Sequence, residues 1–219
     1  VFKYINHAED FGLNKVDATF EFPNVVSRSR GVAEKMSKGI EFLMRKNKID
    51  VILGTAKVKK DKKVDVVAAD GKTTEYSADH IILATGARSR ELPNLPQDGK
   101  KVIGYRQALA MPEQPKSMIV VGSGAIGVEF AYFYATMGTK VTVVEFMPNI
   151  VPVEDEEVSK HLEKSLKKAG IEVMTNASVV SVDTSGAGVK ANVKTAKGDI
   201  VLEADVILSK GQGNFETLL

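Results

Sequence analysis

The most regular pattern of apolar and polar positions lies in the middle of the chain. Residues 118–121 are four consecutive apolar residues, which is typical of a strand buried on both faces of a parallel sheet. A glycine-rich turn follows, and then a mostly apolar stretch, 128–137, predicts a buried helix that Gly138 ends. A second apolar run, 141–144, predicts the next strand. The middle of the chain is therefore expected to fold as strand, glycine turn, helix and strand.

The residues before this unit predict a partial α/β arrangement. Residues 1–8 are expected to be the end of a helix, and the apolar spacing predicts a second helix over 23–48. Short buried strands are expected at 49–53 and 80–85, and a loop at Pro93 to Pro96. A charged turn and an Asp-Gly turn predict a small antiparallel sheet between the two strands, made of residues 56–59, 64–68 and 73–76.

The residues after this unit repeat the same plan. An amphipathic helix is predicted over 155–169 with Gly170 at its end, followed by a strand at 171–174. A last apolar strand is predicted at 206–208. Alternating segments joined by Gly-containing turns lie between these two strands, at residues 178–183, 189–195 and 200–203. Both halves of the chain therefore insert an antiparallel meander between the strands of a parallel sheet.

The glycine turn has the spacing of a dinucleotide-binding fingerprint. Gly122 lets the chain turn sharply, Gly124 lets backbone approach a pyrophosphate, and Gly127 lets the helix pack close to the strand. The helix N-terminus offers free N–H groups and the positive end of its dipole to the phosphates. The predicted phosphate-binding residues are Gly122, Ser123, Gly124, Ala125, Ile126 and Gly127.

Glu145 ends the second strand and lies 23 positions after Gly122 (145 − 122). This is near the spacing of about 20 at which an acidic residue binds the ribose in such sites. A carboxylate there accepts hydrogen bonds from ribose hydroxyls and repels a 2′-phosphate. The next residues, Phe146 and Met147, supply no arginine for such a phosphate. The pattern therefore favours NAD over NADP.

The composition narrows the function classes. The 219 residues are 43% hydrophobic and 26% charged with a net charge of +2, so neither a nucleic acid nor a membrane is expected as a partner. No apolar run approaches the ~18 residues of a membrane span, and no signal peptide is recognised, so a cytoplasmic protein is expected. Without cysteine there is no disulfide or thiolate metal site, and His7, His80 and His161 are too scattered to indicate a metal site.

This doubled plan, with these residues, resembles the flavin- and pyridine-nucleotide-dependent disulfide oxidoreductases, and within them the dihydrolipoamide dehydrogenases. The resemblance runs from about Val1 to Ser209. The similar segments are KYINHAEDFGL, RGVAEKMSKGIEFLMRKNKI, GTAKV, IILATGA, VVGSGAIGVEFA and VTVVEF. The resemblance implies an α/β fold with a Rossmann-like NAD-binding domain and part of an FAD-binding domain, each with an inserted antiparallel meander.

The resemblance also implies roles for single residues. Glu129 matches an acidic position near the nicotinamide, Glu145 the ribose ligand, and Val179 a backbone contact to the adenine of NAD. In the FAD half, Ala56 matches a backbone contact to the adenine part, and Thr85 and Gly86 match residues that lie against the flavin nucleotide.

Several parts of the family pattern are not found in this sequence. They are the family's FAD G-x-G-x-x-G, its C-x-x-x-x-C redox disulfide, its second FAD motif and its C-terminal interface domain with a His-Glu pair. The chain is therefore expected to be the middle of a longer enzyme, with no catalytic residue of its own. Residues 1–114 are assigned to a partial FAD-binding domain and 115–209 to the NAD-binding domain. Residues 210–219 are a return segment of uncertain assignment, since Lys210 and Gln212 fit the family pattern poorly.

The resemblance implies an activity for the intact enzyme. Electrons pass from a dihydrolipoyl dithiol to the disulfide, then to FAD, and then as hydride to NAD. The implied partner is the lipoyl-bearing acyltransferase of a 2-oxoacid dehydrogenase or glycine cleavage complex, and the implied state is a homodimer. Two alternatives stay open. One is a sister enzyme such as a transhydrogenase, NADH oxidase or mercuric reductase, and the other is a non-catalytic NAD-binding or redox-sensing module, which the absence of cysteine permits.

Overall fold

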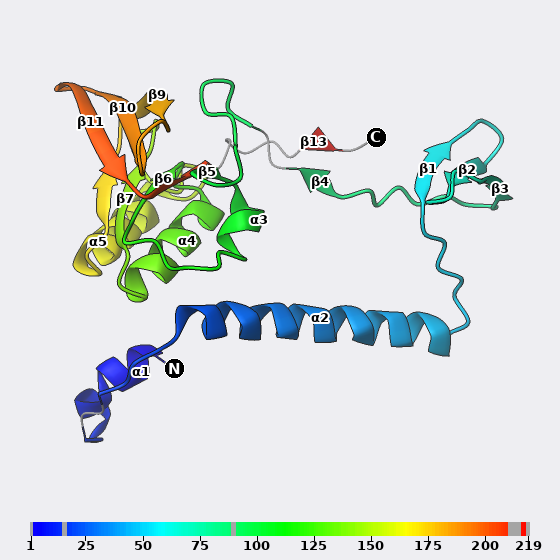
Figure 1. Ribbon diagram of the computed structural model, residues 1–219, viewed down its shortest axis with the longest axis horizontal. Coiled ribbons are helices and arrows are strands. Elements are labelled where there is room, and N and C mark those ends of the chain that lie inside the picture. The colour runs from blue at the N-terminus through cyan, green and yellow to red at the C-terminus, as the bar shows by residue number, and fades with distance from the viewer. Residues whose placement is uncertain (1, 15–16, 89–90, 210–215, 218–219) are drawn as a thin grey trace. The chain divides into compact units, whose positions relative to one another are not determined.

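The computed structural model describes residues 2–14, 17–88, 91–209 and 216–217. The chain divides into two compact units (Figure 1). The larger unit consists of residues 1–28 and 88–216, and the smaller unit of residues 29–87 and 217–219. Most of the return segment of uncertain assignment, 210–215 and 218–219, lies outside the described residues.

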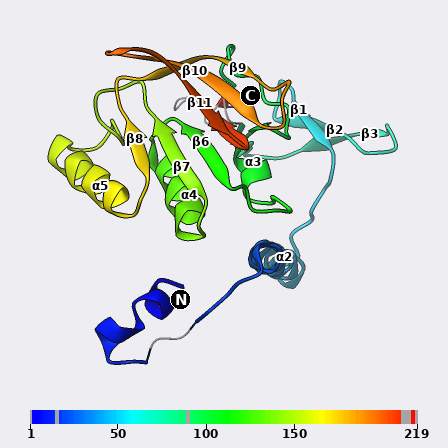
Figure 2. The same cartoon turned by 60° about the vertical axis from the view of Figure 1, so that its left-hand side comes forward.

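A five-stranded parallel sheet forms the centre of the larger unit. The strand β12 (Val206–Ser209) follows the inserted meander in the chain but lies between β5 (Val102–Ile103) and β6 (Ser117–Val121) rather than at an edge. Every neighbouring pair of strands in the sheet is parallel. Figure 2 shows this sheet with its strands side by side. In spatial order the strands are β5 (Val102–Ile103), β12 (Val206–Ser209), β6 (Ser117–Val121), β7 (Lys140–Val144) and β8 (Glu172–Met174).

Helices cover one face of this sheet. Helix α4 (Ala125–Thr136) connects β6 to β7, and α5 (Glu156–Lys168) connects β7 to β8, as the sequence predicts. Asp155 caps α5, because its Oδ1 accepts hydrogen bonds from the N–H groups of Glu157 and Val158 at 2.8 and 3.3 Å. The core between sheet and helices contains alternate residues of the strands together with Ala131, Tyr134 and Leu166.

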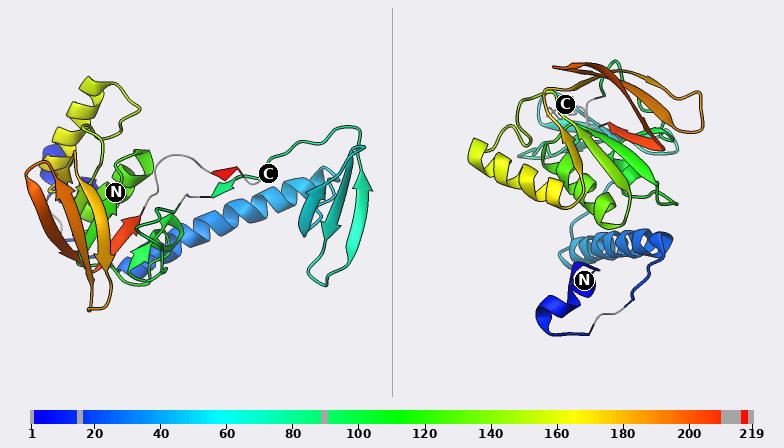
Figure 3. Two further views of the ribbon diagram at one scale, coloured as in Figure 1. Left: turned by 90° about the horizontal axis from the view of Figure 1, so that it is seen from above. Right: turned by 90° about the vertical axis from the view of Figure 1, so that its left-hand side faces the viewer.

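An antiparallel meander covers the other face (Figure 3). Its strands are β9 (Ser178–Asp183), β10 (Val189–Thr195) and β11 (Gly198–Ala204), in the spatial order β11-β10-β9. In β10, Val189, Ala191 and Val193 are buried and the residues between them are not, so the period-2 pattern places one face against the sheet. The predicted insertion of a meander between β8 and β12 is therefore confirmed.

The smaller unit contains the predicted antiparallel sheet. Its strands β1 (Thr55–Val58), β2 (Lys63–Val67) and β3 (Thr73–Ser77) pair in chain order. Asp61 and Lys62 have φ values of 60° and 58°, which suits the right-handed twist of a tight hairpin. Lys59 and Lys63 both contact the Glu75 carboxylate, at 2.8 and 2.7 Å, and hold the exposed face together.

Two strands predicted in the first half are not formed. Residues 49–53 and 80–85 have no strand pairing, and their side chains are largely exposed, with Leu53 at 82% and Ile82 at 89%. A buried parallel strand needs a hydrogen-bonded neighbour on at least one side. No strand among the described residues pairs with these two segments, so the predictions of buried strands there are wrong for this chain.

The predicted long helix is present as α2 (Phe22–Lys46). Its first residue is buried in the larger unit, where the Phe22 ring lies 6.0 Å from the ring of Tyr134. Further along, the apolar positions that set the helical spacing are exposed, with Met36 at 67%. The remaining elements are α1 (Phe2–Asn6), η1 (Ala8–Phe11), α3 (Tyr105–Ala108) and the short pair β4 (Ala87–Arg88) and β13 (Glu216–Thr217).

Within the described ranges, no helix has both the length and the apolar content to cross a bilayer. The same ranges contain no group of three or more histidine, aspartate and glutamate side chains placed to hold a metal ion.

Candidate functional site

The glycine turn lies at the carboxyl edge of the parallel sheet, directly after β6. Gly122 has φ +94°, a value that side chains disfavour, and its N–H donates to the Val144 carbonyl at 2.9 Å. A Cβ atom on Gly127 would lie 2.1 Å from the carbonyl oxygen of Gly122. Both glycines are therefore required by the backbone, one for the turn and the other for the close approach of α4 to β6.

The N-terminus of α4 is directed at this edge. Gly124 is the N-cap residue and has no side chain to accept a hydrogen bond from the first turn. The first helical hydrogen bond runs from the Val128 N–H to the Gly124 carbonyl at 3.1 Å. The N–H groups of Ala125, Ile126 and Gly127 therefore have no acceptor within the helix. They form a set of backbone donors at the positive end of the helix dipole, which suits a phosphate group.

Glu145 is 2% exposed and ties the glycine turn to the end of β7. Its Oε2 accepts hydrogen bonds from the N–H and the hydroxyl of Ser123, both at 2.7 Å, and its Oε1 accepts from the Met147 N–H at 2.8 Å. An ionised carboxylate offers about four acceptor positions, so about one is left for a ligand hydroxyl. Glu145 thus has a structural role in addition to its predicted ribose contact.

A pocket of about 170 Å³ lies beside this edge and brings three of the predicted residues together. Gly122, Glu145 and Val179 all line it, although they come from different parts of the chain. The other lining residues are Leu92, Asn94, Val121, Val144, Phe146, Ala177 and Ser178. A complete small-molecule site is typically ~300–1,000 Å³, so this pocket suits one ring system of a larger ligand.

One wall of this pocket, formed by the loop at Leu92 to Leu95, is not predicted from the sequence. Asn94 Nδ2 donates to the Val179 carbonyl at 2.7 Å across 85 positions of sequence. Pro93 and Pro96 indicate a loop in this stretch, but no local pattern shows which strand the loop contacts.

Glu129 does not line this pocket. It is exposed on α4, beyond the first turn, while the pocket lies on the meander side of the carboxyl edge.

Ser209, at the end of β12, is 1% exposed, and its hydroxyl has no hydrogen-bond partner among the described residues. It pairs in register with Val121, the last residue before the glycine turn. The carboxyl edge thus contains free amides, a carboxylate and an unpartnered hydroxyl, and these residues fit a dinucleotide.

The residues expected to contact FAD are exposed in the smaller unit. Ala56 is exposed on β1, and Thr85 and Gly86 are exposed in the segment that forms no strand. Gly86 has φ +74°, as a turn glycine does. None of the three lines a described pocket. Among the described residues, these three therefore line no common pocket for a flavin, and their FAD contacts stay a prediction.

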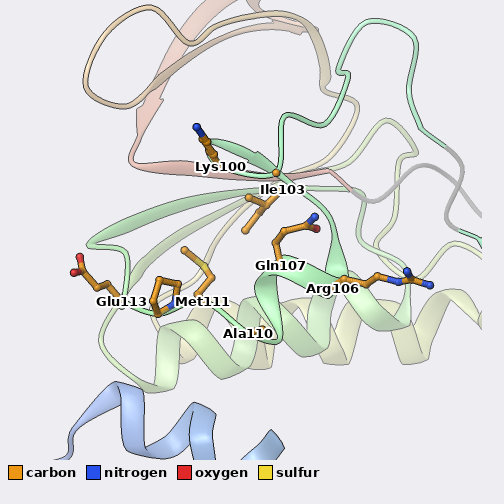
Figure 4. Close-up of a pocket in the computed structure, with 9 residues that line it drawn as sticks. Lys100, Ile103, Arg106, Gln107, Ala110, Met111 and Glu113 are labelled. Atoms are coloured by element: carbon orange, nitrogen blue, oxygen red, sulfur yellow. The ribbon is translucent and has the colours of Figure 1, made fainter.

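A larger pocket of about 560 Å³ lies at α3 in the larger unit (Figure 4). Ile103 and Met111 contribute apolar surface, and Lys100, Arg106 and Glu113 contribute charges. It contains none of the residues that the sequence singles out, and the two pockets share no lining residue.

The parallel sheet, the glycine turn and the inserted meander define the class of this protein. The family described as pyridine nucleotide-disulphide oxidoreductase matches residues 6–212, so the chain belongs to that family. Members of this family use FAD and NAD. The resemblance inferred from the sequence motifs is thereby confirmed.

Within this family, the chain is similar in sequence to dihydrolipoyl dehydrogenases. The enzyme of Rhizobium etli is 42% identical over 100% of this chain and 49% of its own length. That of Chlorobaculum tepidum is 46% identical over 88% of this chain and 41% of its own length. The crystal structure of LpdA from Mycobacterium tuberculosis has a TM-score of 0.85 and 29% identity, and the match covers 96% of this chain and 46% of that one. This chain therefore spans about half the length of the curated relatives it matches.

Proposed function

We propose that the chain is the central part of a dihydrolipoyl dehydrogenase and that residues 115–209 are its NAD-binding domain. The observation that carries this proposal is the carboxyl edge of the larger unit. There the amides of the α4 N-terminus and the Glu145 carboxylate lie beside a ring-sized pocket. Residues 1–114 contribute to the FAD-binding domain, although Val102 and Ile103 pair with β12 in the larger sheet.

In this proposal the residues of the chain bind and orient the dinucleotide. The amides of Ala125, Ile126 and Gly127 bind the pyrophosphate, and Glu145 accepts a ribose hydroxyl while it keeps the glycine turn in place. Bound NAD supplies the hydride acceptor of the reaction. Glu129, exposed on α4, is the proposed neighbour of the nicotinamide, and the Val179 backbone is the proposed neighbour of the adenine.

The whole enzyme would oxidise a dihydrolipoyl group carried by an acyltransferase of a 2-oxoacid dehydrogenase or glycine cleavage complex. The names of the relatives support this substrate class. The redox disulfide, the acid–base pair and a homodimer interface are proposed for the part of the enzyme beyond this sequence. A cytoplasmic location stays a prediction from the sequence.

A sister enzyme of the same architecture is the second candidate. The flavoprotein disulfide reductase RclA of Escherichia coli matches with a TM-score of 0.73 and 24% identity, so it shares the fold alone. Assignment to the dihydrolipoyl dehydrogenases has the stronger support, because those relatives reach 42–46% identity. The non-catalytic module remains the third candidate.

Titration of the purified chain with NADH, followed by the fluorescence of the nicotinamide, tests the binding proposal. Saturable binding supports it, and no binding at millimolar NADH contradicts it. Assay of the longest natural chain that contains these residues, with dihydrolipoamide and NAD, tests the activity. Turnover of another disulfide substrate in preference to dihydrolipoamide would favour the sister enzyme, and no turnover of either would favour the module.

A further inference from the structure

The ring-sized pocket beside the glycine turn is lined by apolar residues and by a few polar side chains. Leu92, Val121, Val144 and Ala177 contribute apolar surface, which suits the faces of a flat ring. The Glu145 carboxylate is largely occupied by the donors of Ser123 and Met147. Recognition of the ring edge is therefore left to the remaining polar side chains of the wall, and Asn94 is the longest of them.

The hydrogen bond of Asn94 determines which way its amide faces. Its Nδ2 donates to the Val179 carbonyl at 2.7 Å. A flip of the amide would place Oδ1 against that carbonyl oxygen and pair two acceptors, which is unfavourable. That bond uses one of the two Nδ2 N–H groups, so the Asn94 amide keeps Oδ1 as an acceptor and one N–H as a donor, in a fixed orientation.

The loop that carries Asn94 is held in place before any ligand binds. Leu95 is buried in the core under the meander, and its N–H donates to the Leu92 carbonyl at 2.9 Å. Gln97 Nε2 donates to the Ser209 carbonyl at 3.3 Å and joins the loop to β12. Pro93 and Pro96 restrict the backbone on both sides of Asn94. Such preorganisation lowers the cost of binding.

We propose that Asn94 is a specificity residue for the base of the dinucleotide, and that it selects adenine because its Oδ1 accepts a hydrogen bond from the exocyclic amine. This inference rests on the proposed NAD site. Adenine presents an N6 amine donor, whereas hypoxanthine presents an oxygen acceptor at the same position. In this orientation Oδ1 accepts a hydrogen bond from the N6 amine of adenine and is repelled by the oxygen of hypoxanthine, while the second Nδ2 N–H can donate to a ring nitrogen of either base.

The test compares binding of NADH with binding of its hypoxanthine analogue, reduced nicotinamide hypoxanthine dinucleotide, to the 219-residue chain. The wild-type chain should bind NADH about 5-fold or more tightly than the analogue, which corresponds to one neutral hydrogen bond. Asn94→Ala should bring this ratio close to one. The matched control is Asn192→Ala, since the Asn192 amide donates to Ser181 Oγ on the same meander and does not line the pocket. It should leave the ratio unchanged.

Two results would overturn the inference while leaving the proposed function intact. One is equal binding of both nucleotides by the wild-type chain. The other is a loss of affinity in Asn94→Ala that is the same for both nucleotides, because it would mean that Asn94 only supports the Val179 backbone. If the wild-type chain binds neither nucleotide, the proposed NAD site itself fails.

Discussion

Replacement of Gly127 by alanine tests the geometry of the glycine turn most directly. The added Cβ would lie 2.1 Å from the Gly122 carbonyl oxygen, whereas close carbon–oxygen contacts are about 3.3 Å. The N-terminus of α4 would therefore have to move by about 1 Å away from β6. The obstacle is backbone, so no change of side-chain rotamer can relieve it.

The expected cost follows from two opposing effects. Overpacking of a core costs about 1–3 kcal/mol, and the upper end applies here because the clash involves backbone atoms. Alanine gains about 1 kcal/mol over glycine within a helix, which offsets part of this cost. A net loss of about 2 kcal/mol corresponds to a fall in Tm of about 4–8 °C for a protein of this size. Affinity for NADH should fall about 10- to 100-fold, because the displaced amides lose at least one charge-assisted hydrogen bond.

Thermal unfolding followed by circular dichroism and an NADH titration would measure both effects. The matched control is Gly39→Ala in α2, where an added Cβ would meet no atom within 4 Å. That change should raise the stability by about 0.5–1 kcal/mol and leave NADH binding unchanged. If Gly127→Ala kept both the Tm and the NADH affinity of the parent chain, the close approach of α4 to β6 would not be a requirement of the site.

Three further predictions concern cofactor preference, catalytic activity and pH dependence. The chain should prefer NADH to NADPH, because the buried Glu145 carboxylate repels a 2′-phosphate, and equal or better affinity for NADPH in parallel titrations would contradict this. The purified chain should be colourless and without dihydrolipoamide turnover, since it has no cysteine and its expected FAD contacts are exposed. A yellow preparation with stoichiometric flavin would refute this. Hydrogen bonds from Lys59 and, to a smaller extent, Lys63 lower the pKa of Glu75 from 4.5 to about 2, so their contribution to the β1–β3 sheet is complete above pH 4.5 and is lost as the pH falls towards 2. Glu75→Gln should flatten the stability of the chain over that range in acid unfolding experiments, and an unchanged pH profile would argue against the ion pairs.

The amino-acid sequence is sufficient to predict the unit from β6 to β7 and the meander that follows β8. These elements depend on short-range features, namely apolar runs, a period of two residues and glycine at positions with strict backbone demands. The spacing of Gly122 and Gly127 was enough to assign their roles, because a sharp turn after a strand and a close helix–strand contact both exclude a side chain.

Residues 49–53 and 80–85 have apolar runs that resemble those of β6 and β7, but they form no strand. An apolar run predicts a strand only when a neighbouring strand is present to pair with it. That neighbour is a property of the tertiary structure and not of the run itself.

The edge of the site is completed by contacts that form only when the chain is folded. In the folded chain, β12 lies between β5 and β6, and the Glu145 carboxylate accepts a hydrogen bond from the glycine turn. Asn94 donates to Val179, which lies 85 positions away in the sequence. Each of these contacts joins residues far apart in the sequence. Local periodicity and turn chemistry contain no information about such partners, because the packing of the sheet, the meander and the loop at Leu92 to Leu95 selects them together.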